Sequence, residues 1–234
     1  MDVRTIQLKK TILENNDQDA DLLREQLKAD GTYYMNIMSS PGSGKTTTLL
    51  GTIKGLQELG SADDCRERCP LKVGVMEADI DSNVDAKTIA EKAGVPSIQL
   101  HTGGMCHLDA DMSRQGLREI GAKDLDLVFL ENVGNLVCPA EFDTGAVKSA
   151  VILSIPEGDD KPLKYPLMFT VTQAVLVNKT DTRKFFAFDD EAFVERVHAL
   201  NPLSEIFFVS AKTGEGFDAW ISWLRRQIML SKAM

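Results

Sequence analysis

The chain has 234 residues, of which 43% are hydrophobic and 26% charged, and its formal net charge is −9 at pH 7. This length suits one α/β domain, and the apolar fraction is enough for a sizeable core. The acidic balance, without a cluster of Lys and Arg, argues against nucleic acid or an anionic membrane surface as a partner. No apolar run approaches membrane-spanning length and the N-terminus lacks a signal-peptide core, so we expect a cytoplasmic protein.

Residues 1–30 are expected to form an N-terminal helical segment, and residues 31–234 one α/β domain. Apolar residues from Ile6 to Leu27 recur among charged ones at helical spacing, and Gly31 ends the run. The Asn15, Asn16 and Asp17 triplet could interrupt this helix. We interpret the segment as an amphipathic helix packed on the domain.

A glycine-rich stretch, residues 39–46 with the sequence SSPGSGKT, follows the apolar run 33–38 and leads into a helical pattern. A strand, a loop and a helix in this order form a phosphate-binding P-loop. Loop N–H groups and the helix dipole would face the phosphates, Lys45 would reach the outer phosphates, and the Thr46 hydroxyl could bind Mg²⁺. The phosphate-binding residues are predicted to be Gly42, Ser43, Gly44, Lys45, Thr46 and Thr47. Ser39 replaces the first glycine of the usual pattern, so a plain glycine-rich turn is the alternative.

Beyond this loop, apolar runs alternate with helical patterns to the end of the chain. Strands are expected at 33–38, 71–79, 97–100, 125–130, 149–154, 174–177 and 206–209, and helices at 47–59, 84–94, 108–120, 189–200 and 216–229. Residues 135–146 are expected to form a long loop, and residues 157–166 a polar turn with prolines. The alternation predicts a three-layer α/β fold of the P-loop NTPase type, with a mostly parallel sheet of about seven strands and helices on both faces.

Two acids close predicted strands on the ligand side of such a sheet. Ligands bind beyond the carboxyl ends of parallel strands, so Asp79 and Glu131 would lie near the phosphates and their Mg²⁺. Glu131 opens the run ENVG, in which the Gly134 N–H could bond the γ-phosphate. We therefore assign catalytic roles to Lys45, Asp79 and Glu131. A strand-end acid satisfied by a turn is the alternative for Glu131.

The sequence NKTD at residues 178–181 follows a predicted strand, and SAK at 210–212 follows the next. These match the guanine-binding elements of P-loop GTPases, with Asn178, Lys179, Asp181, Ser210, Ala211 and Lys212 as the binding residues. A carboxylate at Asp181 can accept hydrogen bonds from the guanine ring N–H and amine together, whereas adenine offers no such donor pair. The Ala211 N–H could donate to the guanine carbonyl. GTP and GDP are thus the predicted ligands.

Cys106, His107 and Cys138 are soft and borderline metal ligands that lie beside two predicted nucleotide-contacting segments. Three such ligands suit Zn²⁺ or Ni²⁺, with a fourth from water or a second subunit. Cys106 would sit just before a helix whose dipole favours a thiolate. Two buried cysteines and a capping histidine are nearly as good an interpretation of the residues alone. Cys65 and Cys69 could chelate a metal, but we interpret their segment as a surface loop.

The chain resembles the HypB family of hydrogenase nickel-incorporation GTPases. The resemblance is carried by SSPGSGKTT, TGGMCHLDA, ENVGNLVCPAEFDTG, EGDDKPLKYP and VLVNKTD, which run from the P-loop to the guanine motif. It implies that residues 31–234 are a GTPase domain of the SIMIBI class and that Cys106, His107 and Cys138 form a Ni²⁺ or Zn²⁺ site at a dimer interface. It also implies GTP-linked homodimerisation and nickel delivery to a hydrogenase large subunit together with the small zinc protein HypA.

Some members of this family carry an N-terminal CxxCGC motif or a His-rich stretch, and this chain has neither. High-affinity or storage-type nickel binding near residue 1 is therefore not expected. No residue can be identified as a catalytic glutamine or a built-in arginine finger, so we expect slow intrinsic GTP hydrolysis. The alternatives are a urease nickel GTPase of the UreG type, a regulatory GTPase with structural cysteines, and a P-loop kinase. The adjacent Cys106 and His107 favour the HypB family over UreG.

Overall fold

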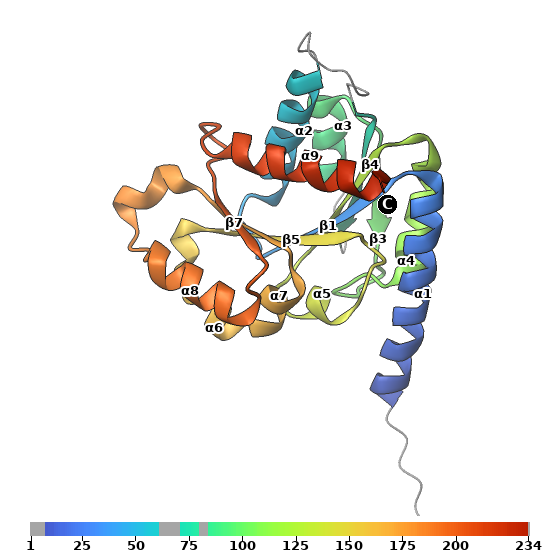
Figure 1. The fold of residues 1–234 in the computed structure, drawn as a ribbon, viewed down its shortest axis with the longest axis horizontal. Helices are drawn as coiled ribbons and strands as arrows, with labels where there is room; N and C mark the ends of the chain where they lie inside the picture. The colour runs from blue at the N-terminus through green and yellow to red at the C-terminus, as the bar shows by residue number, and fades with distance from the viewer. Residues whose placement is uncertain (1–7, 61–70, 80–83, 234) are drawn as a thin grey trace, which may run out of the picture.

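The computed structural model in Figure 1 describes residues 8–60, 71–79 and 84–233. Its centre is one sheet of seven strands in the order β3-β2-β4-β1-β5-β6-β7. Every neighbouring pair is parallel. Strands of such a sheet are buried on both faces, and the near-continuous apolar runs of the sequence reflect this. The predicted fold class is confirmed.

The elements follow the predicted alternation. The strands are β1 (Tyr33–Ser39), β2 (Val73–Asp79), β3 (Ser97–His101), β4 (Leu127–Gly134), β5 (Lys148–Ser154), β6 (Ala174–Asn178) and β7 (Glu205–Phe208). The α-helices are α1 (Leu8–Asp30), α2 (Lys45–Gly60), α3 (Val84–Ala93), α4 (Ala110–Glu119), α5 (Cys138–Glu141), α6 (Lys161–Lys164), α7 (Pro166–Val171), α8 (Asp190–Leu200) and α9 (Phe217–Ala233). Short 3₁₀ turns span Ala122–Asp124, Ile155–Glu157 and Thr180–Phe185.

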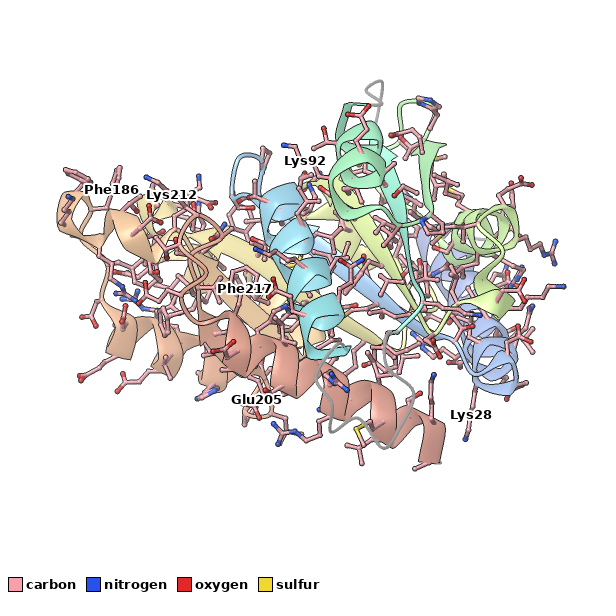
Figure 2. The ribbon with its side chains drawn as sticks, turned by 90° about the horizontal axis from the view of Figure 1, so that it is seen from above. Lys28, Lys92, Phe186, Glu205, Lys212 and Phe217 are labelled. Carbon is pink, nitrogen blue, oxygen red and sulfur yellow. The ribbon has the colours of Figure 1, made fainter. Side chains whose placement is uncertain are left out.

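Helices cover both faces of the sheet, and three apolar clusters join the layers. On one face, α2, α3 and α9 pack against the strands through side chains such as Ile53, Ile89 and Trp220. Figure 2 shows α2 and α9 lying across this face. On the other face, α1 and α4 cover the β2 and β4 side, whereas α7 and α8 cover the β5 and β6 side. This second face is therefore covered by two separate pairs of helices, α1 with α4 and α7 with α8.

The structure differs from the sequence prediction mainly in three short helices. The predicted loop at 135–146 contains α5, and the predicted polar turn at 157–166 contains α6 and the start of α7. Each of these helices has proline in its first turn, where the missing N–H costs no hydrogen bond. One or two turns are too short to produce a helical periodicity. Conversely, α1 runs through Asn15, Asn16 and Asp17 without a break.

The strand register places the functional segments at one edge of the sheet. At its carboxyl end β1 pairs with both β4 and β5, and Ser39 lies opposite Gly134 and Ile152. The β1–β4 register shifts between Ile37 and Ser39. The end of β4 is thereby brought beside the loop that follows β1. None of the helices that the structure describes has the length and apolar character needed to cross a bilayer.

Candidate functional site

The P-loop joins β1 to α2 as the sequence predicts. Gly42 and Gly44 have φ of 74° and 92°, a region that glycine enters without steric cost. A Cβ atom on Gly44 would lie 2.5 Å from Asn178 Nδ2, so a side chain there would displace a neighbouring loop. Lys45 and Thr46 begin α2, whose N-terminal N–H groups and dipole favour an anion in the loop.

The magnesium side of the site joins α2 to β4. Thr46 Oγ1 donates to Glu131 Oε1 at 2.7 Å, and Lys45 Nζ lies 3.4 Å from the same oxygen. Glu131 is only 1% exposed. A hydroxyl and a carboxylate held together are hard oxygen ligands, so the residues present fit Mg²⁺. Asp79 ends β2, but its side chain lies outside the described part of the structure.

Glu77 is a second acid at this edge, and sequence reasoning missed it. It is 3% exposed on β2 and lies directly opposite Glu131 in the β2–β4 register. The two buried carboxylates therefore lie on adjacent strands. The sequence did contain a signal, because an acid within the apolar run 73–79 is costly to bury unless the site uses it or pairs it.

Asn178 connects three loops by hydrogen bonds: the P-loop and the loops after β6 and β7. Its Nδ2 donates to Ser43 O in the P-loop at 2.9 Å, and its Oδ1 accepts from Lys179 N at 2.7 Å and Ala211 N at 3.0 Å. The Lys179 Nζ donates to Gly42 O at 2.6 Å. The predicted guanine-binding loops and the phosphate loop are thus one connected frame.

Asp181 lies at the rim of this frame, with its side chain 20% exposed. Its Oδ1 accepts from Ser210 Oγ at 2.8 Å, and its Oδ2 lies 3.8 Å from the exposed Lys212 Nζ. The structure differs from the expectation for Ala211, because its N–H already donates to Asn178. A guanine carbonyl would share or replace this contact with Asn178 Oδ1.

Cys106 and Cys138, which lie far apart in sequence, meet in the fold. Both are free, half-buried cysteines, and the hydrogen bond between their side chains, followed by burial, raises the pKa of Cys106. The geometry does not provide the predicted effect of a helix dipole on Cys106. The following helix, α4, begins only at Ala110 and is capped by Asp109, so Cys106 does not lie in its first turn.

His107 lies beside this thiol pair but faces an aromatic ring. Its Nδ1 is 3.9 Å from Cys106 Sγ, and its ring stacks on Phe142 with centroids 3.7 Å apart and planes 10° apart. Among the described residues, no three His, Cys, Asp or Glu side chains are grouped closely enough to hold a metal ion. The fold brings the three predicted ligands into one neighbourhood without a finished coordination shell. Cys65 and Cys69 lie outside the described residues.

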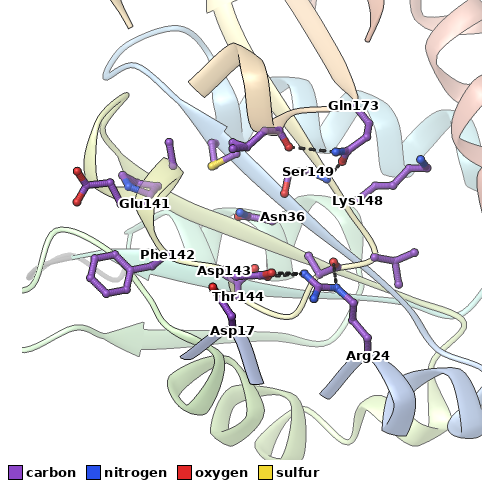
Figure 3. Close-up of a pocket in the computed structure, with 16 residues that line it drawn as sticks. Asp17, Arg24, Asn36, Glu141, Phe142, Asp143, Thr144, Lys148, Ser149 and Gln173 are labelled. Carbon is purple, nitrogen blue, oxygen red and sulfur yellow. Dashed lines mark hydrogen bonds and ion pairs between the residues drawn. The ribbon is translucent and has the colours of Figure 1, made fainter. Parts of the chain in front are cut away.

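A cavity of about 370 Å³ opens next to the segment that follows Cys138. Figure 3 shows it between α1 and the sheet, with Arg24 and Asp143 on one side and Lys148, Ser149 and Gln173 on the other. Arg24 and Asp143, both on its wall, form an ion pair with each other. The cavity therefore borders the segment that follows Cys138 but is lined by none of the predicted metal ligands.

Comparison with known proteins gives consistent matches. The family model described as the CobW/HypB/UreG nucleotide-binding domain matches residues 33–208. Hydrogenase maturation factor HypB of Azotobacter chroococcum mcd 1 is 43% identical over 224 residues, covering 96% of this chain and 70% of that protein. The crystal structure of HypB from Helicobacter pylori in complex with nickel has a TM-score of 0.80 at 36% identity, covering 93% of this chain and 97% of that one. The crystal structure of HypB from Archaeoglobus fulgidus also has a TM-score of 0.80, at 35% identity, covering 92% of this chain and 100% of that one.

Proposed function

Because this chain belongs to the CobW/HypB/UreG family and, within it, to the HypB hydrogenase maturation factors, we propose that it is a GTP-hydrolysing metallochaperone. It binds nickel as cargo and delivers it during the maturation of nickel–iron hydrogenase. The relative crystallised in complex with nickel supports this cargo. Zn²⁺ is the competing ion, because thiolate and imidazole ligands accept both metals.

The proposal rests on one segment, β4 with the start of α5, which carries part of the nucleotide site and part of the proposed metal site. β4 brings Glu131 to Lys45 and Thr46, and its last residue, Gly134, lies against the phosphate loop. Cys138 follows only four positions after Gly134 and begins α5. A rearrangement of Gly134 on the γ-phosphate must therefore move Cys138 as well.

The chemistry at the phosphate end is charge neutralisation and positioning. Lys45 and the loop N–H groups hold the β- and γ-phosphates, and Gly134 N–H contacts the γ-phosphate. Thr46, Glu131 and Asp79 hold Mg²⁺, which when bound neutralises charge developing on the phosphate oxygens. No other catalytic group is assigned, so intrinsic hydrolysis is slow.

Guanine selection falls to the loops after β6 and β7. Asp181 accepts from the base, and Ser210 holds its carboxylate in place. Asn178 and Lys179 fix the loops around the base, with Ala211 and Lys212 at its edge. The frame that joins these loops to Ser43 and Gly42 supports a single nucleotide site.

The cargo end consists of Cys106, His107 and Cys138. GTP assembles a homodimer that completes the metal shell, and hydrolysis loosens it so that nickel moves on. We also propose a cytoplasmic location, a HypA-like chaperone as the nickel partner and the hydrogenase large subunit as the recipient. Within the chain, residues 31–234 are the proposed GTPase domain and α1 packs on it, whereas residues 1–7 of the predicted N-terminal segment lie outside the described residues.

The proposal is tested by two assays on the purified full chain. We expect phosphate release from GTP but not from ATP, at a rate well below the roughly 1–100 s⁻¹ of protein kinases. We also expect bound nickel in equilibrium dialysis, and its transfer to a nickel-free hydrogenase large subunit. A chain that hydrolyses neither nucleotide, or that retains no nickel, would contradict the proposed function.

A further inference from the structure

One side chain of α1, Asn16, contacts both the segment that follows Cys106 and His107 and the segment that follows Cys138. Asn16 is 8% exposed, and its Nδ2 donates to Asp143 O at 2.9 Å. Its Oδ1 accepts from Ala110 N, also at 2.9 Å. Asp143 lies five positions after Cys138, and Ala110 three positions after His107. A single buried carboxamide thus joins the chain that follows Cys106 and His107 to the chain that follows Cys138.

Arg24, two turns further along α1, holds the same segment. Its Nη2 lies 2.5 Å from both carboxylate oxygens of Asp143, and its Nε donates to Ala146 O at 3.0 Å. Figure 3 shows this contact at the wall of the cavity. Asp143 Oδ1 also accepts from Gly145 N at 2.9 Å. Asp143 is therefore fixed through its carbonyl by Asn16 and through its carboxylate by Arg24.

Asp143 is linked to His107 through its neighbour in the chain, Phe142. Phe142 precedes Asp143 and presents the ring on which His107 stacks. The contacts close a circuit that runs from Asn16 to Ala110, back along the chain to His107, across to Phe142, and through Asp143 to Asn16. While this circuit is intact, His107 stays beside Phe142, which lies four positions after Cys138.

We propose that Asn16 is a positioning residue for the nickel site: it sets the separation between the segment of Cys106 and His107 and the segment of Cys138. This inference rests on the proposed function, because it assumes that these three residues bind nickel. Groups that hydrogen-bond directly to metal ligands typically contribute 10- to 100-fold to metal affinity, and Asn16 acts one step further out, through backbone atoms of the two segments. Removal of either hydrogen bond of Asn16 should therefore weaken nickel binding without changing the ligands.

The test compares three variants of the full chain by chelator competition with Ni²⁺ and by nickel–thiolate absorption. Asn16→Ala removes both hydrogen bonds and should weaken nickel binding by about 10-fold, the lower end of the effect of direct ligand partners. Asn16→Asp keeps the acceptor for Ala110 N but sets a buried carboxylate oxygen against Asp143 O, so its loss should be at least as large as that of Asn16→Ala. Asn15→Ala is the matched control, because Asn15 is exposed on the same helix, and it should bind nickel like wild type.

A purely structural role for Asn16 is excluded by measuring GDP affinity on the same samples. The proposal requires that GDP affinity stay at the wild-type value while nickel affinity falls and the absorption band changes. Equal loss of both ligands would overturn it. If Asn16→Ala does not fold, Phe142→Leu provides the second test, because it removes the ring beside His107 and should also weaken nickel binding.

The remaining outcomes separate this inference from the proposed function. If wild type and Asn16→Ala bind nickel equally while Cys138→Ala does not bind it, the inference is wrong and the metal site stands. If wild type itself binds no nickel, both are wrong.

Discussion

Asp181→Asn should weaken GTP binding on the order of 10⁴-fold and create affinity for XTP. The guanine edge presents two donors, and the asparagine amide offers it one acceptor and one donor. Xanthine replaces the exocyclic amine with an oxygen, which the amide N–H can meet. Asparagine can still accept from Ser210 Oγ, so the loop should keep its place. Calorimetric titration with GTP and XTP measures both changes.

Asp190→Asn is the matched control for this substitution. Asp190 is a nearby carboxylate whose ion-pair partner is Arg183, 2.7 Å away, and it has no assigned role at the base. The control should bind GTP like wild type. Undiminished GTP affinity in Asp181→Asn, or ATP competing as well as GTP in wild type, would contradict the guanine assignment.

Cys138→Ala should reduce nickel affinity on the order of 100-fold or more and leave the GTP affinity of the metal-free protein unchanged. A tightly held metal with four ligands gains about 10–16 kcal/mol, so one thiolate contributes about 3 kcal/mol, which corresponds to this factor. Cys138 begins α5 and is not part of the phosphate or base contacts. Metal analysis after dialysis, with GTP titration of the metal-free preparation, measures both quantities.

Cys138→Ser separates coordination from packing at this position. Serine keeps nearly the size of cysteine but is a poor ligand for a soft metal. It should lose nickel as alanine does. If the serine variant retains nickel, Cys138 has a packing role and the thiolate assignment is wrong.

Local patterns predicted most of the fold. Buried parallel strands appear as apolar runs, so all seven strands were predicted, with every end within four residues of the observed one. The P-loop was predicted because strand, glycine turn and helix are contiguous in sequence. The helices α5, α6 and α7 were missed because each is too short for a periodic pattern, and proline looked like a turn residue.

The parts of the site that depend on long-range contacts could not be predicted. The bridge from Asn16 to Asp143 spans 127 positions, and Asn16 read only as a possible break in a helix. Nothing in the sequence around Phe142 or His107 indicates that their rings stack. The contact between Cys106 and Cys138, which raises the pKa of Cys106, could not be predicted because tertiary packing sets it.

The central claim is that one segment, β4 with the start of α5, couples the nucleotide to the metal. Gly134 lies at the phosphate loop and Cys138 at the metal site, with three residues between them. Allosteric coupling of ordinary size, about 1–3 kcal/mol, changes affinity by roughly 5- to 150-fold. The most direct test is the Ni²⁺ dissociation constant of the wild-type chain with GDP and with a non-hydrolysable GTP analogue. We predict tighter nickel binding with the GTP analogue, by at least about 5-fold. Equal dissociation constants in the two nucleotide states would contradict the account.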